Sequence, residues 1–221
     1  LDSLSLCDLV LPHNPDNIQL LCREGIAEKK MEWLIPYYDD MSGIRRSSNG
    51  RDILFFGAMN RPENYLSAIW FIDYVMPLIE DIDIKFIILG GSPTDELRSR
   101  ENHKIHVTGF VDDVIPYFEK AMCLVAPLVL GAGIKVKILE ALSSGIPVIT
   151  NKIGIEGITA DKGKGYLHCE EPEEYAEAVR KIYNAQINDR QLELESNQMM
   201  QVFDLEKSAL RYVDWLCHLC N

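Results

Sequence analysis

The sequence predicts an α/β fold, a doubly wound, Rossmann-like parallel sheet with helices on both faces. Short apolar runs at 53–56, 84–89, 104–107, 122–126, 147–150 and 165–168 have the length and composition of buried strands. Helical patterns separate most of these runs, and glycine closely follows several of them. Strands that alternate with helices are typical of parallel sheets, because each parallel neighbour needs a crossover connection.

The helices between the strands are expected at 64–79, 94–100, 114–120 and 134–144, and three more at 172–185, 189–202 and 204–219 close the chain. Ahead of the first sheet strand, Asn14 followed by Pro15 predicts a helix start, and that helix is expected to reach about Arg23. Two further short strands are expected at 7–11 and 31–35. Residues 41–51, rich in Ser, Gly and Arg, predict an exposed linker.

The most informative stretch runs from Gly131 to Thr150 and combines a glycine loop, a helix and the next strand. We expect that helix to begin at Gly133 or Ile134 and to stop at Gly145. The first N–H groups of a helix have no internal partner, and the helix dipole favours negative charge beside them. A glycine turn that opens a helix after a parallel strand therefore predicts an anion site.

Charged side chains follow this turn, namely Lys135, Lys137 and Glu140. On a 3.6-residue period, Lys137 and Glu140 share a face that is separate from the apolar core positions, so both can reach one ligand. A lysine can contact phosphate oxygens and a carboxylate can accept hydrogen bonds from ribose, which suits a nucleoside diphosphate. The alternative stays open that the two residues are an ordinary surface pair on an amphipathic helix.

This segment resembles the donor-site signature of the retaining glycosyltransferases of family four, which have the GT-B fold. Glu140 matches the second glutamate of the family's Glu-x7-Glu motif, and residues 145–150 match the strand that follows it. Residues 53–64 resemble the first strand and loop of the donor domain, and 107–113 with Tyr117 resemble the loop beside the nucleotide base. Three motifs in the correct order are more specific than any one of them.

The chain departs from the family pattern at several positions. The first glutamate of the motif falls at Ala132, so the chain is closer to a subgroup with the form Gly-x-Gly-x-Lys-x-Lys-x-Leu-Glu, in which Lys137 is the recurrent lysine. The Arg and Lys that bind the diphosphate in most members are here Ala58 and Glu63. We expect Lys137, with Lys135 behind it, to replace that clamp.

The resemblance implies transfer of a sugar, with retention, from a nucleotide diphosphate donor to a hydroxyl of a glycan or lipid-linked acceptor, in the synthesis of a surface polysaccharide or other glycan. Lys137 and Lys135 would stabilise the leaving diphosphate electrostatically. No nucleophile, metal ion or cofactor is expected. Glu156 resembles an acidic position beyond the last strand of the motif, with a plain turn residue as the alternative. The residues expected to bind the donor are Gly57, Ala58, Asn60, Gly109, Phe110, Val111, Gly133, Ile134, Lys135, Lys137 and Glu140.

The resemblance also divides the chain. Residues 1–37 would be the tail of an N-terminal acceptor domain with the interdomain connection. Residues 38–203 would be the nucleotide-sugar donor-binding domain, and 204–221 a helix that packs back toward the N-terminal domain. Because the chain begins at Leu1 and not at Met, we expect most of the acceptor domain to precede it in a longer protein and the fragment to be inactive alone.

Composition limits the partners of this chain. It has 34 acidic and 22 basic residues and a net charge of −12, which argues against a nucleic-acid backbone as the main partner. The six cysteines are scattered through apolar segments, as is typical of reduced thiols. There is no run of about 18 apolar residues. We therefore expect a cytoplasmic protein, with peripheral association at the inner face of the membrane through the acceptor domain.

Two other classes of function stay open. A nucleotide-binding module without catalysis would explain Ala58, Glu63 and Ala132. A Rossmann-type dehydrogenase would need Gly-x-Gly-x-x-Gly after the first strand and an acid about 20 residues further on. Residues 57–62 lack that motif, so the dehydrogenase is less favoured. The sequence leaves the base, the sugar, the acceptor and the linkage open.

Overall fold

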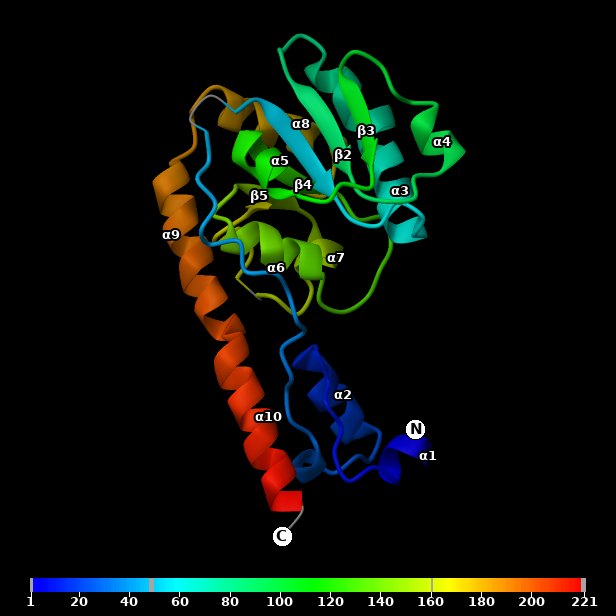
Figure 1. Cartoon of the computed structure of the whole chain (residues 1–221), viewed down its shortest axis with the longest axis vertical. Helices are drawn as coiled ribbons and strands as arrows, with labels where there is room; N and C mark the ends of the chain where they lie inside the picture. Colours follow the sequence, from blue (N-terminus) through cyan, green and yellow to red (C-terminus); the bar gives the residue numbers. More distant parts are fainter. Residues whose placement is uncertain (1, 48–49, 160, 220–221) are drawn as a thin grey trace.

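The computed structural model describes residues 2–47, 50–159 and 161–219 (Figure 1). Its sheet has six parallel strands in the order β3-β2-β1-β4-β5-β6. The strands are β1 (Asp52–Phe56), β2 (Lys85–Leu89), β3 (Ile105–Gly109), β4 (Ala121–Ala126), β5 (Val148–Thr150) and β6 (Leu167–His168). All six predicted sheet strands are confirmed, with ends that differ from the prediction by at most two residues.

Helices cover both faces of the sheet, which confirms the doubly wound fold. Successive residues of a strand point to opposite faces, so Ile53 and Phe55 of β1 join one apolar core while Leu54 joins the other. The first core lies under α3 (Pro62–Trp70) and α8 (Pro172–Tyr183), and the second under α5 (Ile115–Lys120) and α6 (Val136–Ser143). Each fully buried aliphatic or aromatic side chain contributes about 1.5–3 kcal/mol, so the two cores together stabilise the sheet.

Most predicted helices are present. They include α2 (Asp16–Arg23), α4 (Asp95–Arg98), α9 (Asp189–Met200) and α10 (Leu205–Leu219), and the shorter elements are α1 (Asp2–Ser5), α7 (Lys152–Ile155), η1 (Glu28–Lys30) and η4 (Gln201–Phe203). Within the described ranges, none of the helices is both long and apolar enough to cross a bilayer.

The helix predicted over 64–79 is present, but it is not α-helical throughout. The α-helix α3 ends at Trp70 and is followed by the π-helical turn η2 (Phe71–Val75) and the 3-10 turn η3 (Met76–Ile79). Pro77 explains the change, because proline has no N–H to donate and its ring crowds the carbonyl four residues earlier.

The two strands predicted at 7–11 and 31–35 are also wrong. These segments share a single parallel bridge between Val10 and Met31. Pro12 and Pro36 have no N–H groups to extend a ladder, and the local apolar cluster holds only three buried residues, so little stabilises a longer pairing here.

A linker, defined here as residues 36–47, connects this N-terminal segment to the sheet and lies against α6. The Asp39 N–H donates to Glu140 Oε1 at 3.4 Å and the Met41 N–H to Ser143 Oγ at 3.0 Å. Figure 1 shows α9 and α10 running down past the sheet toward the N-terminal segment. Just before the linker, the Ile35 N–H donates to Ser208 Oγ of α10 at 3.1 Å. The proposed division at 37/38 and 203/204 stays a prediction, and its last residues, 220–221, lie outside the described ranges.

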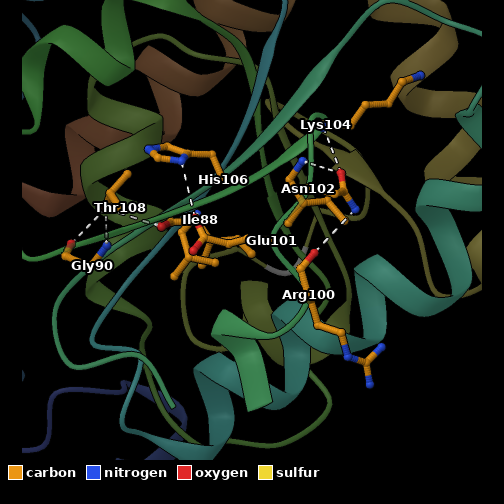
Figure 2. A network of polar contacts seen from close by, with 11 residues as sticks. Ile88, Gly90, Arg100, Glu101, Asn102, Lys104, His106 and Thr108 are labelled. Atoms are coloured by element: carbon orange, nitrogen blue, oxygen red, sulfur yellow. Dashed lines mark hydrogen bonds and ion pairs between the residues drawn. The ribbon is translucent and has the colours of Figure 1, made fainter. Parts of the chain in front are cut away.

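Strand β3 forms one edge of the sheet, and polar side chains around it satisfy backbone donors, as Figure 2 shows. The Glu101 carboxylate accepts the Val107 N–H at 3.0 Å and lies 3.5 Å from His106 Nδ1. At the carboxyl end of the strand, Thr108 Oγ1 accepts the Gly90 N–H at 3.4 Å. The contact of Glu101 with Val107 caps an edge donor and so limits pairing with another chain, and the contact of Thr108 with Gly90 joins the ends of β3 and β2.

Tyr175 generates a test of the core. It is buried against Trp70 and Phe71, with ring centroids 5.6 and 6.3 Å apart, and its hydroxyl has no hydrogen-bond partner in the described part of the chain. Because a buried hydroxyl without a partner costs free energy, we expect Tyr175→Phe to raise the free energy of unfolding by about 1 kcal/mol in urea denaturation. The matched control Tyr166→Phe removes a hydroxyl that contacts His168 Nδ1 at 3.1 Å and should lower it by about 1 kcal/mol. A Tyr175→Phe variant less stable than the wild type would contradict the expectation.

Candidate functional site

The strand order reverses direction between β1 and β4, and a crevice opens there. The chain passes from β1 outward to β2 and β3, and then crosses back to β4 on the other side of β1. Loops at the carboxyl ends of such a strand pair diverge, and ligands of open α/β sheets bind between them. A cavity of about 350 Å³ lies at this point. It is lined by Gly57, Ala58, Arg61, Glu63, Asn64, Leu128, Gly131, Ala132, Ile134, Lys135, Val136 and Lys137.

The loop before α6 is longer than predicted. Gly133 has φ +71°, in the left-handed region that favours glycine, and Lys135 is extended at φ −97° and ψ 98°. The helix therefore begins at Val136, and the predicted start at Gly133 or Ile134 is wrong. The Gly133 N–H belongs to the loop, where it donates to Glu156 Oε2 at 3.1 Å.

Lys137 is the second residue of α6, and its side chain lines the cavity. Its Nζ donates to Asn64 Oδ1 and lies 4.9 Å from the ring centroid of Phe55. Burial lowers the pKa of Lys137 to about 8, against an opposing effect of the nearby Glu63 carboxylate. Within the described ranges, no carboxylate lies at ion-pair distance from this ammonium. Lys137 is therefore a partly desolvated cation beside a cavity, an arrangement that favours an anionic ligand.

Asn64 is a site residue that the predicted binding set did not include. It is buried, and its Nδ2 donates to the Ala58 carbonyl at 2.9 Å while its Oδ1 accepts from Lys137. A Cβ at Gly57 would lie 2.8 Å from Asn64 Nδ2, so the glycine is needed for this contact. The sequence offers only a weak signal for Asn64, because Ser67 is a second buried polar residue on the same helix.

Glu156 is the second addition. Its Oε2 accepts the Gly133 N–H and lies 3.4 Å from Lys135 Nζ, which also donates to the Gly133 carbonyl. The Lys135 side chain is only 10% exposed and the Glu156 side chain 40% exposed. The Glu156 carboxylate thus contacts the Gly133 amide and Lys135, two groups expected to bind an anion. This contact favours a role for Glu156 in the site over the alternative of a plain turn residue.

Glu140 contacts the linker and does not line the cavity, unlike Lys137 on the same helix. The residue is 8% exposed, and its carboxylate faces the backbone of the linker at Asp39. Burial raises the pKa of Glu140, and the negative charge of Asp39 adds to this effect, while the hydrogen bond from the Asp39 N–H opposes it. Its predicted contact with ribose stays a prediction.

The structure brings together some of the predicted residues and separates others. Gly57, Ala58, Ile134, Lys135 and Lys137 line the cavity, and the Gly133 amide lies beside it.

The other predicted residues do not line the cavity: Asn60, Gly109, Phe110, Val111 and Glu140. Phe110 is 78% exposed on the loop after β3. Because β3 is separated from β1 by β2, this loop can serve only a ligand that extends along the carboxyl edge of the sheet from the cavity.

The doubly wound sheet with its crevice at the strand reversal has the fold of the GT-B glycosyltransferase domains. The sequence profile described as "Glycosyl transferases group 1" matches residues 50–185. The match extends over more than half of the chain, and the chain belongs to this family.

Solved structures share this fold, and one curated relative matches part of the sequence. HepE from Anabaena, solved with UDP and glucose, superposes with a TM-score of 0.74 at 14% identity over 96% of this chain and 63% of that chain. Sucrose-phosphate synthase from Thermosynechococcus elongatus gives 0.74 at 17% identity over 98% and 59%. A protein described as an uncharacterized 44.6 kDa protein in the cps region of Klebsiella pneumoniae is 27% identical over 151 residues. That match covers 62% of this chain and 39% of the relative, so the chain spans well under two thirds of that relative's length.

The buried ammonium makes stability depend on pH in a defined direction. The pKa of Lys137 is about 8 in the folded state against 10.5 in the unfolded chain, so the unfolded state binds more protons between these values. We therefore expect the free energy of unfolding of the wild type to rise with pH from about 8 to 10.5 relative to a Lys137→Met variant, which has no ammonium. Urea denaturation of both proteins across this range measures the difference, and the other titrating groups cancel in the comparison. A difference that is constant with pH would contradict the burial of this charge.

Proposed function

We propose that this chain is the donor-binding domain of a retaining glycosyltransferase of family four, from the Gly-x-Gly-x-Lys-x-Lys-x-Leu-Glu subgroup. The observation that carries the proposal is the cavity at the β1–β4 reversal, where the Lys137 ammonium is held without a carboxylate partner in the described part of the chain. The reaction transfers a sugar from a nucleotide diphosphate to a hydroxyl acceptor. Membership of the group 1 glycosyltransferases supports this reaction class.

In this proposal the cavity binds the diphosphate. Lys137 donates to phosphate oxygens from one side, and the Gly133 amide and Lys135 donate from the other after the Glu156 carboxylate leaves them. These groups stabilise the negative charge that develops on the leaving diphosphate, which is an electrostatic role that needs no proton transfer by the protein. The proposal includes no metal ion or cofactor, because these donors supply the positive field.

The donor we propose is a UDP-sugar. The support is that HepE was solved with UDP-glucose, and the pneumococcal O-GlcNAc transferase GtfA with UDP and GlcNAc. In this arrangement the base lies toward Gly109, Phe110 and Val111. The ribose contacts Glu140, whose carboxylate turns from the linker to the sugar hydroxyls.

For the whole protein we propose an acceptor that is a growing glycan or a lipid-linked glycan, in the synthesis of a surface polysaccharide. The relative in the cps region of Klebsiella pneumoniae supports this setting. The proposal places the protein in the cytoplasm at the inner face of the membrane, with residues 1–37 and 204–221 belonging to the acceptor side. The fragment alone is then inactive.

A second candidate is a nucleotide-binding module without catalysis. Ala132, Ala58 and Glu63 favour it, because they stand where the family pattern has residues that contact the sugar and the diphosphate. A longer protein that includes the acceptor domain distinguishes the two candidates. Transfer or hydrolysis of a UDP-sugar by that protein supports the transferase, and UDP binding without turnover supports the module.

Calorimetric titration tests the site directly. We expect UDP to bind this chain more tightly than GDP or ADP, and Lys137→Ala and Glu140→Ala each to weaken UDP binding by roughly tenfold or more, because each removes a charge-assisted hydrogen bond. Unchanged affinity for UDP in both variants would show that UDP does not bind beside α6. Circular dichroism of each variant confirms that it is folded.

Substitution of Glu156 is expected to strengthen UDP binding, whereas substitution of Lys137 or Glu140 weakens it. Its carboxylate competes with the diphosphate for the Gly133 amide and for Lys135, so we expect Glu156→Gln to bind UDP several-fold more tightly. The matched control is Glu96→Gln, which removes the same charge from the exposed surface of α4 and should leave the affinity unchanged. Weaker UDP binding by Glu156→Gln would instead mean that the carboxylate itself contacts the ligand.

A further inference from the structure

A second cavity lies at the amino ends of the strands, opposite the candidate donor site at their carboxyl ends. It has a volume of about 440 Å³, and its walls include Arg46, Arg51, Met122 and Tyr183. Arg51 directly precedes β1 and Met122 lies at the start of β4, so this cavity opens at the amino ends of the strands. The five residues of β1 separate the two sites by roughly 16 Å, at about 3.3 Å per residue.

Arg46 brings a positive charge to this cavity that the described residues do not neutralise. Its Nη1 donates to the Gly145 carbonyl at 3.0 Å and its Nη2 to the Met122 carbonyl at 3.5 Å, and both acceptors are uncharged. Its Nε is buried and has no hydrogen-bond partner across the described ranges. A guanidinium remains charged under physiological conditions, and burying it without an anion is unfavourable.

Arg51, which is exposed, brings a second positive charge to the cavity wall. Its guanidinium carbon lies 4.8 Å from the ring centroid of Tyr183, and Nη1 donates to the Tyr183 hydroxyl. Neither Arg46 nor Arg51 is within ion-pair distance of a carboxylate in residues 2–47, 50–159 and 161–219, although acidic residues outnumber basic ones by 34 to 22. Asp189 lies on the cavity wall but is exposed and forms no ion pair with either arginine there.

We propose that this cavity binds a phosphate group, either free phosphate or the phosphate of a small monoester. Guanidinium forks match the oxygens of a phosphate and form strong charge-assisted hydrogen bonds with it. Such a ligand would accept from Arg51 and lie against the Arg46 guanidinium on the cavity wall, and would supply the missing negative charge. The cavity is larger than a bare phosphate, which leaves room for the carbon portion of a monoester. The proposal does not depend on the proposed donor site.

Thermal stabilisation of the whole chain tests this site. We expect inorganic phosphate and glycerol 3-phosphate each to raise the Tm saturably at matched ionic strength, because a ligand that binds only the folded state stabilises it. Arg51→Gln should weaken this binding roughly tenfold, and Arg46→Lys, which keeps the charge but loses the fork, should weaken it as well. The matched control Arg45→Gln changes the same charge on a neighbouring residue that does not line this cavity, and should bind phosphate as the wild type does. Tighter binding of glycerol 3-phosphate than of inorganic phosphate identifies the ligand as a monoester, and the reverse order identifies it as free phosphate.

Three results would overturn the proposal. The first is the absence of saturable stabilisation by both probes in the wild type. The second is an equal response in Arg51→Gln and in the wild type. The third is loss of the phosphate-induced rise in Tm in Lys137→Ala. That result would place the phosphate in the cavity beside α6 and not in the cavity at the amino ends of the strands.

Discussion

The pairing of β1 with β4 is the constraint on which the candidate site depends. These two strands are neighbours in the middle of the sheet, yet the chain reaches β4 only after it has formed β2 and β3 on the other side of β1. Right-handed crossovers then place α3 and α6 on opposite faces of the sheet. The loops after β1 and β4 diverge as a result. The cavity is therefore a property of the strand order, and the side chains on its walls determine what it can bind.

Lys137 shows how the fold maintains a costly charge in that cavity. Burial disfavours the ammonium, and the compensating contacts are the Asn64 amide oxygen and the face of the Phe55 ring. Both are neutral groups, so they orient the charge without neutralising it. An acidic partner would have made Lys137 more stable and less available to an anion. In a chain of net charge −12, keeping carboxylates out of direct contact with this ammonium gives a local positive field in a negative molecule.

The sequence predicts the sheet well because the signals for its strands are local. Each strand is a short apolar run bounded by polar or turn residues, and burial of both sheet faces leaves no other stable placement for such runs. The errors arise where a distant contact decides the local structure. The start of α6 depends on the contact between Gly133 and Glu156, 23 residues away, and no local signal marks it. Glu140 contacts the linker 101 residues earlier in the chain. Pro77, by contrast, is a local signal for the end of a regular helix and could have been used.

The contacts of the linker with α6 also have a mechanical consequence. The amides of Asp39 and Met41 are held by Glu140 and Ser143, and Ile35 just before them is held by Ser208 of α10. A displacement of the linker must either break these hydrogen bonds or move α6 with it. Any ligand that draws Glu140 away from Asp39 therefore weakens the attachment of the linker to α6. Coupling between two sites acts in both directions. A movement of the N-terminal segment or of α10 that shifts the linker therefore changes the affinity of α6 for its ligand.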